Sequence, residues 1–302
     1  MKKLVIVLSA IFVAFQCIAA AETNSNKYIT KDYDLKDFTG IHASGIVEVQ
    51  LAKSNTWKVS VTLPEDLEPY LDVRVTNGKL SFTMRQVPLR VSKNFKNWTV
   101  TAKVAMPVFR SLSMSGATSF VCNDSFNLGD KDFKLDLSGA SKANGLDLTS
   151  RNLDIEMGGA TSVSLRGDFQ NVDIEMGGAA KGNFEFNADR LNQEVSGGAK
   201  AIHSGEFGDI KSETSGAGVF KLTGAADNIE IEASGAAKVE TTRATVRTIK
   251  ASLSGASYCE VNALDNLVVD ASGASSLRYV DNESMRLDIR SNNRGSSVTK
   301  MK

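Results

Sequence analysis

The stretch Leu153-Asp-Ile-Glu-Met-Gly-Gly-Ala-Thr-Ser-Val-Ser-Leu165 holds the pattern that the rest of the chain repeats. Apolar and polar residues alternate up to Met157 and again from Val163, as in strands that bury one face. We expect the chain to bend at Gly158-Gly159-Ala160, because glycine allows a positive φ and small side chains fit a tight corner. A second corner is expected at Arg166-Gly-Asp-Phe-Gln-Asn171. Each repeat therefore predicts two strands.

The turn tripeptide Ser/Gly-Gly-Ala recurs through most of the chain, with a second glycine in place of the alanine at one position. Its central glycine stands at Gly116, Gly139, Gly159, Gly178, Gly197, Gly216, Gly235, Gly255 and Gly273. A near-constant period of about 20 residues is the signature of a solenoid. We predict an all-β, parallel β-helix of roughly nine or ten rungs, about 45 Å long. A leucine-rich repeat has a similar period, but it requires an Asn soon after a Leu-x-Leu strand.

Aligning the repeats on the turn glycine predicts which side chains face the interior. Two columns are almost wholly apolar or small, so we expect them to point inward. Two residues before the glycine stand Met114, Leu137, Met157, Met176, Val195, Thr214, Ala233, Leu253 and Ala271; four after it stand Phe120, Ala143, Val163, Gly182, Ala201, Phe220, Val239, Cys259 and Leu277.

A further column, seven residues before the glycine, is mostly Asn or Asp. Its members are Asn152, Asn171, Asp209, Asn228 and Asn266. These residues tolerate the left-handed conformation and bond their own backbone at turns. We therefore expect this column to mark the corner that enters each strand.

The ends of the chain differ from its middle. Residues 1–21 read as a signal peptide, because Lys2 and Lys3 precede an apolar run that ends in small residues before a cleavage site near Ala21. Residues 22–110 are predicted to form an N-terminal cap of rungs decorated by a short helical excursion and a hairpin. Residues 111–302 are predicted to form the regular part of the β-helix, which ends in a degenerate rung.

These patterns resemble the head GIN domain family of auto-transporter adhesins, found among exported proteins of Bacteroides-like bacteria. The matching motifs are Phe38-x-x-Ile41-x-x-Ser44-Gly45, Val73-x-Val75-x-x-Gly78-x-Leu80, Val104-x-x-Pro107, Leu112-x-x-Ser115-Gly116-Ala117 and the Ser-Gly-Ala coils. The resemblance covers about residues 33–290. It implies a right-handed β-helix at the cell envelope, and it brings no catalytic residues.

Composition narrows the function classes. The chain has 35 basic and 35 acidic residues, which argues against nucleic acid as a partner because such proteins carry a clustered basic face. No segment has the roughly 20 apolar residues of a transmembrane helix. We expect an exported protein of the periplasm or cell surface. Lipid attachment at Cys17 is the less favoured alternative, because Ala14-Phe15-Gln16 departs from the lipoprotein pattern.

An acidic column supplies the candidate binding site. Three residues before the turn glycine, on the outward side, five consecutive repeats carry Glu156, Glu175, Glu194, Glu213 and Glu232. We call these five residues the acidic ladder. Neighbouring charges at ~4.8 Å repel by about 0.9 kcal/mol in water, so the ladder predicts binding of a cation such as Ca²⁺ or of a basic partner. The favoured interpretation is an ordinary solvated face, kept so by splayed side chains and by the lysines that recur on the next strand: Lys142, Lys181, Lys200 and Lys238.

The histidines and cysteines favour structural roles. His42 and His203 lie many repeats apart, so no histidine-centred hydrolytic or metal site is expected. Cys122 and Cys259 are separated by seven repeats, or ~34 Å along the axis, which is too far for a disulfide. We expect both to be buried thiols and His203 to belong to the core.

Together these features predict a non-enzymatic protein that presents a regular surface for binding or adhesion, with a glycan or a protein at the cell surface as partner. The alternative is a carbohydrate-active enzyme of the lyase or glycosidase type, which would need carboxylates converging on particular rungs. The acidic ladder is uniform instead. A site near Trp57, Tyr70 and Trp98 is the remaining place for catalysis, although a hydrophobic plug is the favoured interpretation.

Overall fold

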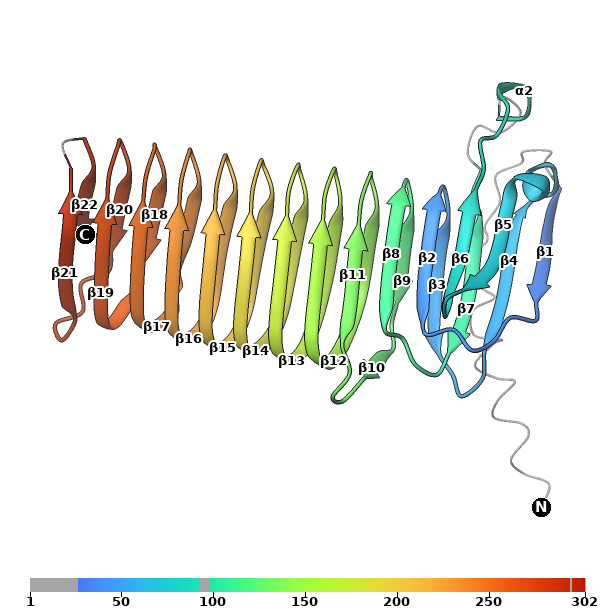
Figure 1. Ribbon diagram of the computed structural model, residues 1–302, viewed down its shortest axis with the longest axis horizontal. Coiled ribbons are helices and arrows are strands. Elements are labelled where there is room, and N and C mark those ends of the chain that lie inside the picture. Colours follow the sequence, from blue (N-terminus) through green and yellow to red (C-terminus); the bar gives the residue numbers. More distant parts are fainter. Residues whose placement is uncertain (1–26, 93–97, 294, 302) are drawn as a thin grey trace, which may run out of the picture.

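The chain folds into a β-solenoid of about ten turns, as predicted. The computed structural model describes residues 27–92, 98–293 and 295–301, so the predicted signal peptide and Cys17 lie outside the described residues. Parallel coils stack side by side along one long axis (Figure 1). Within the described residues, no helix is long and apolar enough to cross a bilayer.

Each middle coil is one long strand that bends, rather than two separate strands. These strands are β12 (Lys142–Met157), β13 (Ser162–Met176), β14 (Lys181–Val195), β15 (Lys200–Thr214), β16 (Val219–Ala233) and β17 (Lys238–Leu253). The corner predicted at residues 166–171 is therefore a bend within one strand and not a division between two, because β13 pairs with β14 on both sides of it, from Ser162 to Met176. The bend interrupts the register at single positions, such as Gln170 in β13, while the glycine turn separates one long strand from the next.

Shorter strands form the coils that flank this middle part. On the N-terminal side they are β8 (Ser111–Gly116), β9 (Ser119–Cys122), β10 (Ser125–Asn127) and β11 (Phe133–Leu137). On the C-terminal side they are β18 (Tyr258–Val261), β19 (Ala263–Ala271), β20 (Ser276–Tyr279), β21 (Arg286–Asn292) and β22 (Ser297–Lys300).

The turn glycines stack directly on one another. Gly178 has a φ of 67°, and a Cβ atom built on it would lie 2.8 Å from the carbonyl oxygen of Gly159 in the preceding coil. Gly159 has the same relation to Gly139, at 2.5 Å. Glycine is therefore required twice over, by the left-handed backbone and by the close approach of the neighbouring main chain.

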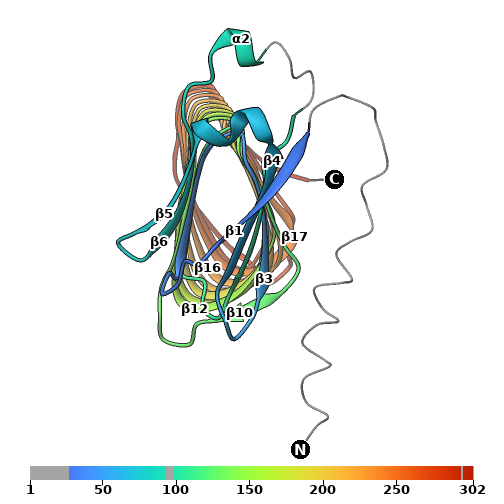
Figure 2. The ribbon, with the colours of Figure 1, turned by 90° about the vertical axis from the view of Figure 1, so that its right-hand side faces the viewer.

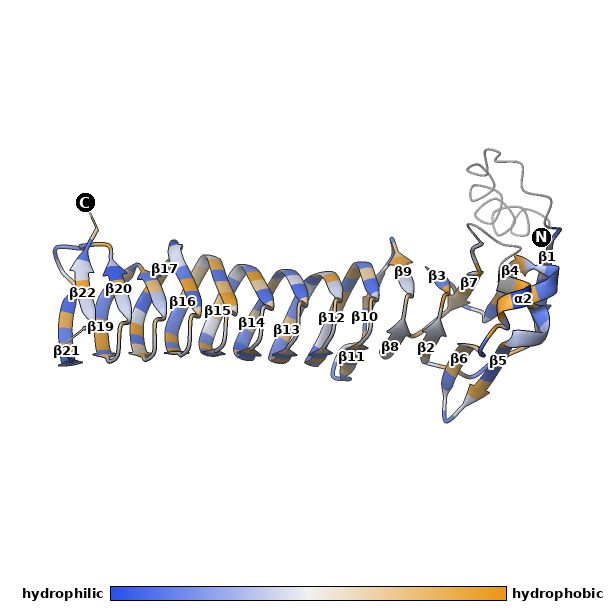
Figure 3. Ribbon diagram, turned by 90° about the horizontal axis from the view of Figure 1, so that it is seen from above, coloured by the Kyte–Doolittle hydropathy of each residue, from blue (hydrophilic) through white to orange (hydrophobic). Residues whose placement is uncertain are grey.

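The two inward columns line a continuous dry interior. Leu137, Met157, Met176 and Val163 are all buried, which confirms the predicted alternation. Apolar and polar positions alternate along every coil in Figure 3. Seen along the axis in Figure 2, the coils form a flattened tube, so each has two broad faces that meet at the glycine turn.

The Asn and Asp column has a different role from the one predicted. None of its members has a positive φ in the described residues, where Asp37 and Asn77 are the non-glycine exceptions. Instead, the side chains join adjacent coils. Asn171 Nδ2 donates to Asn152 Oδ1 at 2.9 Å, and Asn228 donates to Asp209 at 2.8 Å.

In the N-terminal region, strands that are neighbours in space are not consecutive in the sequence. The first coil, β2 (Gly40–Gly45) and β3 (Glu48–Lys53), lies between β8/β9 and an outer layer of β6 (Lys79–Met84) and β7 (Thr101–Met106). Antiparallel strands extend that layer: β1 (Tyr28–Tyr33) pairs with β4 (Lys58–Pro64), which pairs with β7, and β5 (Leu71–Thr76) pairs with β6. The 3₁₀ helix η1 (Glu65–Tyr70) joins β4 to β5, and the one-turn helix α2 (Leu89–Ser92) projects from this layer after β6 (Figure 1).

Aromatic residues of the N-terminal region pack against the core. The hairpin predicted at Asn77-Gly78 joins β5 to β6, with φ of 51° and 72° at its two turn residues. Trp57 Nε1 donates to the Phe38 carbonyl at 2.9 Å. Trp57, Tyr70 and Trp98 are half-buried against the core.

Candidate functional site

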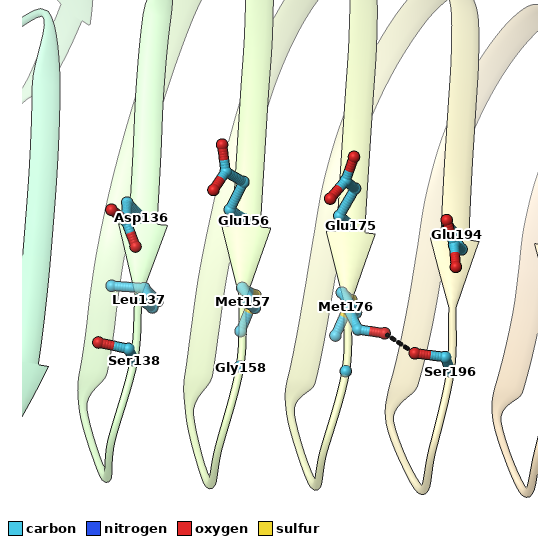
Figure 4. A pocket seen from close by; sticks show the side chains of 11 residues that line it. Asp136, Leu137, Ser138, Glu156, Met157, Gly158, Glu175, Met176, Glu194 and Ser196 are labelled. Atoms are coloured by element: carbon cyan, nitrogen blue, oxygen red, sulfur yellow. Dashed lines mark hydrogen bonds between the residues drawn. The ribbon is translucent and has the colours of Figure 1, made fainter.

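The acidic ladder forms one unbroken row on a broad face of the solenoid. Strand pairing sets each member against the next, from Glu156 opposite Glu175 to Glu213 opposite Glu232. Asp136 extends the row by one coil. Figure 4 shows Asp136, Glu156, Glu175 and Glu194 side by side on neighbouring strands. Stacking of the repeats therefore places the carboxylates one coil apart, as the sequence predicts.

Two shallow depressions follow this row. One, of about 360 Å³, is lined by Asp136 and by Glu156, Glu175 and Glu194. The second, of about 370 Å³, continues from Glu194 past Glu213 and Glu232. Their other wall is formed by small residues just before the turn, where Ser196 Oγ donates to the Met176 carbonyl at 3.3 Å (Figure 4). The acidic ladder thus borders a long, open groove with no aromatic side chain in its lining.

Only part of the acidic ladder is neutralised within the molecule. Lys134 Nζ lies 2.6 Å from Glu156, and Lys211 Nζ lies 2.7 Å from Glu213. These contacts raise the pKa of both lysines, with the hydrogen bond to the glutamate as the largest cause. In the described part of the chain, Glu175, Glu194 and Glu232 have no ion-pair partner. The electrostatic cost of the row is therefore only partly offset.

The neutralising lysines are not the ones that the sequence suggests. Lys142, Lys181, Lys200 and Lys238 follow the glycine turn and lie on the other broad face. None of them pairs with the acidic ladder; Lys238 pairs with Glu240. These four lysines therefore do not neutralise the acidic ladder, because the turn separates the two columns onto opposite faces. Four of the five ladder glutamates are exposed, and Glu213 is partly buried.

No group of three His, Cys, Asp or Glu side chains comes together as a metal site in the residues that the structure describes. Adjacent carboxylates in the row lie in line rather than around a point, whereas Ca²⁺ takes six to eight converging oxygens. Ca²⁺ binding by the acidic ladder stays a prediction.

His203 and the two cysteines occupy the core, as expected. His203 is fully buried, its Nε2 lies 2.9 Å from Gln193 Oε1, and its ring stacks on Phe184. Burial lowers the pKa of His203 to about 3. The same desolvation raises the pKa of Cys122 to about 11 and that of Cys259 to about 12. Buried thiols with such a raised pKa stay protonated near neutral pH and are poor nucleophiles.

The structure adds one residue to the row that sequence analysis missed. His42 pairs in register with Ser113 and extends the same outward column; its Nδ1 lies 3.2 Å from Ser113 Oγ. Burial, the largest cause, lowers the pKa of His42. Aligning Ser44-Gly45 with Ser115-Gly116 places His42 three residues before its glycine. The signal is weak in the sequence, because 71 residues separate His42 from Ser113 and no regular repeat links them.

The fold and this face define a β-solenoid that carries a repetitive charged surface. The chain belongs to the family described as "Putative auto-transporter adhesin, head GIN domain", whose pattern matches residues 37–201 and 172–282. This confirms the family resemblance seen in the sequence.

Two solved structures share the fold. One, described as "a putative adhesin from Parabacteroides merdae", is 17% identical, with a TM-score of 0.51 over 92% of this chain and 98% of its own. The other, "a putative adhesin" from Bacteroides fragilis, is 16% identical, with a TM-score of 0.52 over 92% of this chain and 99% of its own. No curated protein matches the chain.

Proposed function

We propose that this protein is an exported, non-catalytic binding protein of the cell envelope, and that the acidic ladder is the surface through which it adheres to a basic partner. The observation that carries the proposal is the row of carboxylates along an open groove, in which Glu175, Glu194 and Glu232 lack ion pairs within the described residues. Membership of an adhesin family supports the same role.

The physical reason is electrostatic. Like charges one coil apart destabilise the folded chain, and a partner that brings cations to the row removes that cost on binding. An exposed ion pair contributes only about 0.2–1 kcal/mol. Affinity must therefore come from several pairs formed together along a rigid array, which favours an extended partner over a single small ion.

Binding to immobilised poly-L-lysine, followed by biolayer interferometry, tests the proposal. Replacing Glu175, Glu194 and Glu232 by Gln should weaken binding about tenfold, since three lost pairs total about 1.5 kcal/mol. The matched control replaces Glu185, Asp189 and Glu206, three exposed acidic residues outside the acidic ladder, by their amides.

The control variant should bind as the unmodified protein does. Equal binding by both triple variants would show that net charge, and not the acidic ladder, holds the polycation. Poly-L-glutamate serves as the negative probe, and capture on it would likewise contradict the proposal.

A carbohydrate-active enzyme is the alternative. Such an enzyme needs one place where carboxylates differ from their neighbours in environment, whereas this row repeats and the linings of the two depressions contain no aromatic platform. Incubation with pooled polysaccharides should yield no new reducing ends and no unsaturated products. Product formation that is lost with the acidic ladder would replace the adhesive role by a catalytic one.

A further inference from the structure

The two broad faces carry opposite charges in matching positions. The acidic column lies three residues before each turn glycine, and the lysine column, Lys142, Lys181, Lys200 and Lys238, lies three residues after it. The acidic column has a member in every coil from Gly139 to Gly235, whereas lysine occupies its position in four of these six coils. Because both columns follow the same stacked coils, their positions along the axis match. The glycine turn between the two columns forms one edge of the tube, so the columns lie on opposite sides of that edge.

The coils that carry a lysine are the coils whose acidic residue is left unpaired. Around Gly178, the described residues give neither Glu175 nor Lys181 an ion pair, and the same holds for Glu194 and Lys200 around Gly197. Asp136 and Lys142, around Gly139, repeat the pattern. In the coil of Gly235, Glu232 is unpaired, while Lys238 shares Glu240 with Lys221.

The two remaining coils of this stretch show the converse. The coil of Gly159 has Ser162 in the lysine position, and its Glu156 is neutralised by Lys134. The coil of Gly216 has Val219 there, and its Glu213 is neutralised by Lys211. From the coil of Gly139 to that of Gly235, internal neutralisation is therefore present where the opposite face lacks a lysine and absent where it has one. Beyond this stretch, Asp270 in the coil of Gly273 has no ion pair in the described residues and faces no lysine position, because Ser276 stands there.

We propose that the basic partner of the acidic ladder is a second copy of this chain, whose lysine column packs against it face to face. The inference rests on the proposed function of the acidic ladder. When the two copies lie at the same height along the solenoid axis, each lysine of one copy meets an unpaired carboxylate of the other. The pairs are Lys142 with Asp136, Lys181 with Glu175, Lys200 with Glu194 and Lys238 with Glu232.

If one copy is shifted along the axis by one coil, most of its lysines meet a carboxylate that is already paired or a serine. The arrangement with both copies at the same height is therefore favoured. The contact joins different faces of the two copies, which makes it heterologous. Such contacts do not close on themselves when the copies are related by translation. Side-by-side rows of molecules result, an arrangement suited to adhesion between copies.

Sedimentation velocity of the full chain tests this association. The weight-average mass should exceed that of the monomer at low ionic strength and return to it in about 0.5 M salt, which screens exposed pairs. Two charge-swapped variants sharpen the test: K142E/K181E/K200E and E175K/E194K/E232K. Each variant alone should stay monomeric, and an equimolar mixture should associate, because each then supplies the charge that the other lacks.

The neutral variant K142Q/K181Q/K200Q, with circular dichroism to verify folding, covers the case in which a charge swap disturbs the fold. A monomeric unmodified protein at low salt, or unchanged association of the neutral variant, would overturn the inference. Poly-L-lysine binding separates this result from the proposed function. If the unmodified protein binds poly-L-lysine but does not self-associate, only the self-association is wrong. If the unmodified protein does not bind poly-L-lysine, the proposed function itself is wrong.

Discussion

Mild acid should destabilise this protein through His203. The imidazole lies in the core among Phe184, Phe186, Phe207 and Phe220, and its Nδ1 has no partner in the described part of the chain. Protonation would place a cation among these rings. Burial therefore lowers the pKa of His203 from 6.5 to about 3 in the folded state.

The sign and size of the effect follow from proton linkage. Below pH 6.5 the unfolded chain binds a proton at this histidine and the folded chain does not, so the free energy of unfolding falls as pH falls. Each pH unit below that value costs about 1.4 kcal/mol until the folded state itself titrates near 3. Between pH 8 and pH 5, the loss amounts to about 2 kcal/mol.

Urea unfolding followed by far-UV circular dichroism at pH 8 and pH 5 measures this loss. The control is Q193I/H203L, which places in each position a residue found in the same column of nearby repeats, such as Ile174 and Leu222. Gln193 also donates to the buried Ser212 Oγ at 2.9 Å, so the double variant loses this bond and should be less stable by about 1–3 kcal/mol at both pH values. That constant loss cancels when the change between pH 8 and pH 5 is compared. Because surface carboxylates titrate in both proteins, their contribution cancels, and the unmodified protein should lose about 2 kcal/mol more. An equal loss in the two proteins would refute the reasoning.

Three further outcomes are expected. Gly178→Ala should lower the free energy of unfolding in urea by about 2–3 kcal/mol. Gly78→Ala has a similar positive φ but open space around the new Cβ, so it should lower that free energy by only about 1 kcal/mol. Equal losses would show that the stacked main chains do not constrain the turn. The triple glutamine variant of the acidic ladder should raise the melting temperature at low salt and leave it unchanged in about 0.5 M salt; an effect that persists in salt would not be electrostatic. Peptide mapping after iodoacetamide treatment should find Cys122 and Cys259 unmodified in the native protein and alkylated in urea, and native labelling would contradict their burial.

The regular coils could be predicted because each follows from short-range rules. Period-two alternation assigned Met157 and Val163 to the interior, and the repeat length placed Glu156 opposite Glu175. A solenoid makes such predictions reliable, since each coil contacts mainly its neighbours and the same packing problem recurs. Recurrence also explains why the acidic ladder could be identified before its surroundings were known.

Two predictions from residue type were wrong for a common reason. Asn171 was expected to adopt a turn conformation, and Lys142 was expected to neutralise the acidic ladder. Both assignments used preferences of single residues. In the fold, a neighbouring coil offers Asn171 a side-chain partner at 2.9 Å, and the turn carries Lys142 to the other face.

The sequence by itself determined the stacked coil, its inward columns and the glycine turn, because alternation and repeat length are local properties of the chain. Only the tertiary structure decided that β2 and β3 lie inside an outer layer formed by later strands, and that His42 joins the row of Ser113. It also decided which carboxylates are neutralised. The physical reason is that strand edges and ion pairs select partners by proximity in space, and the excursion between β3 and β8 changes which residues are near one another.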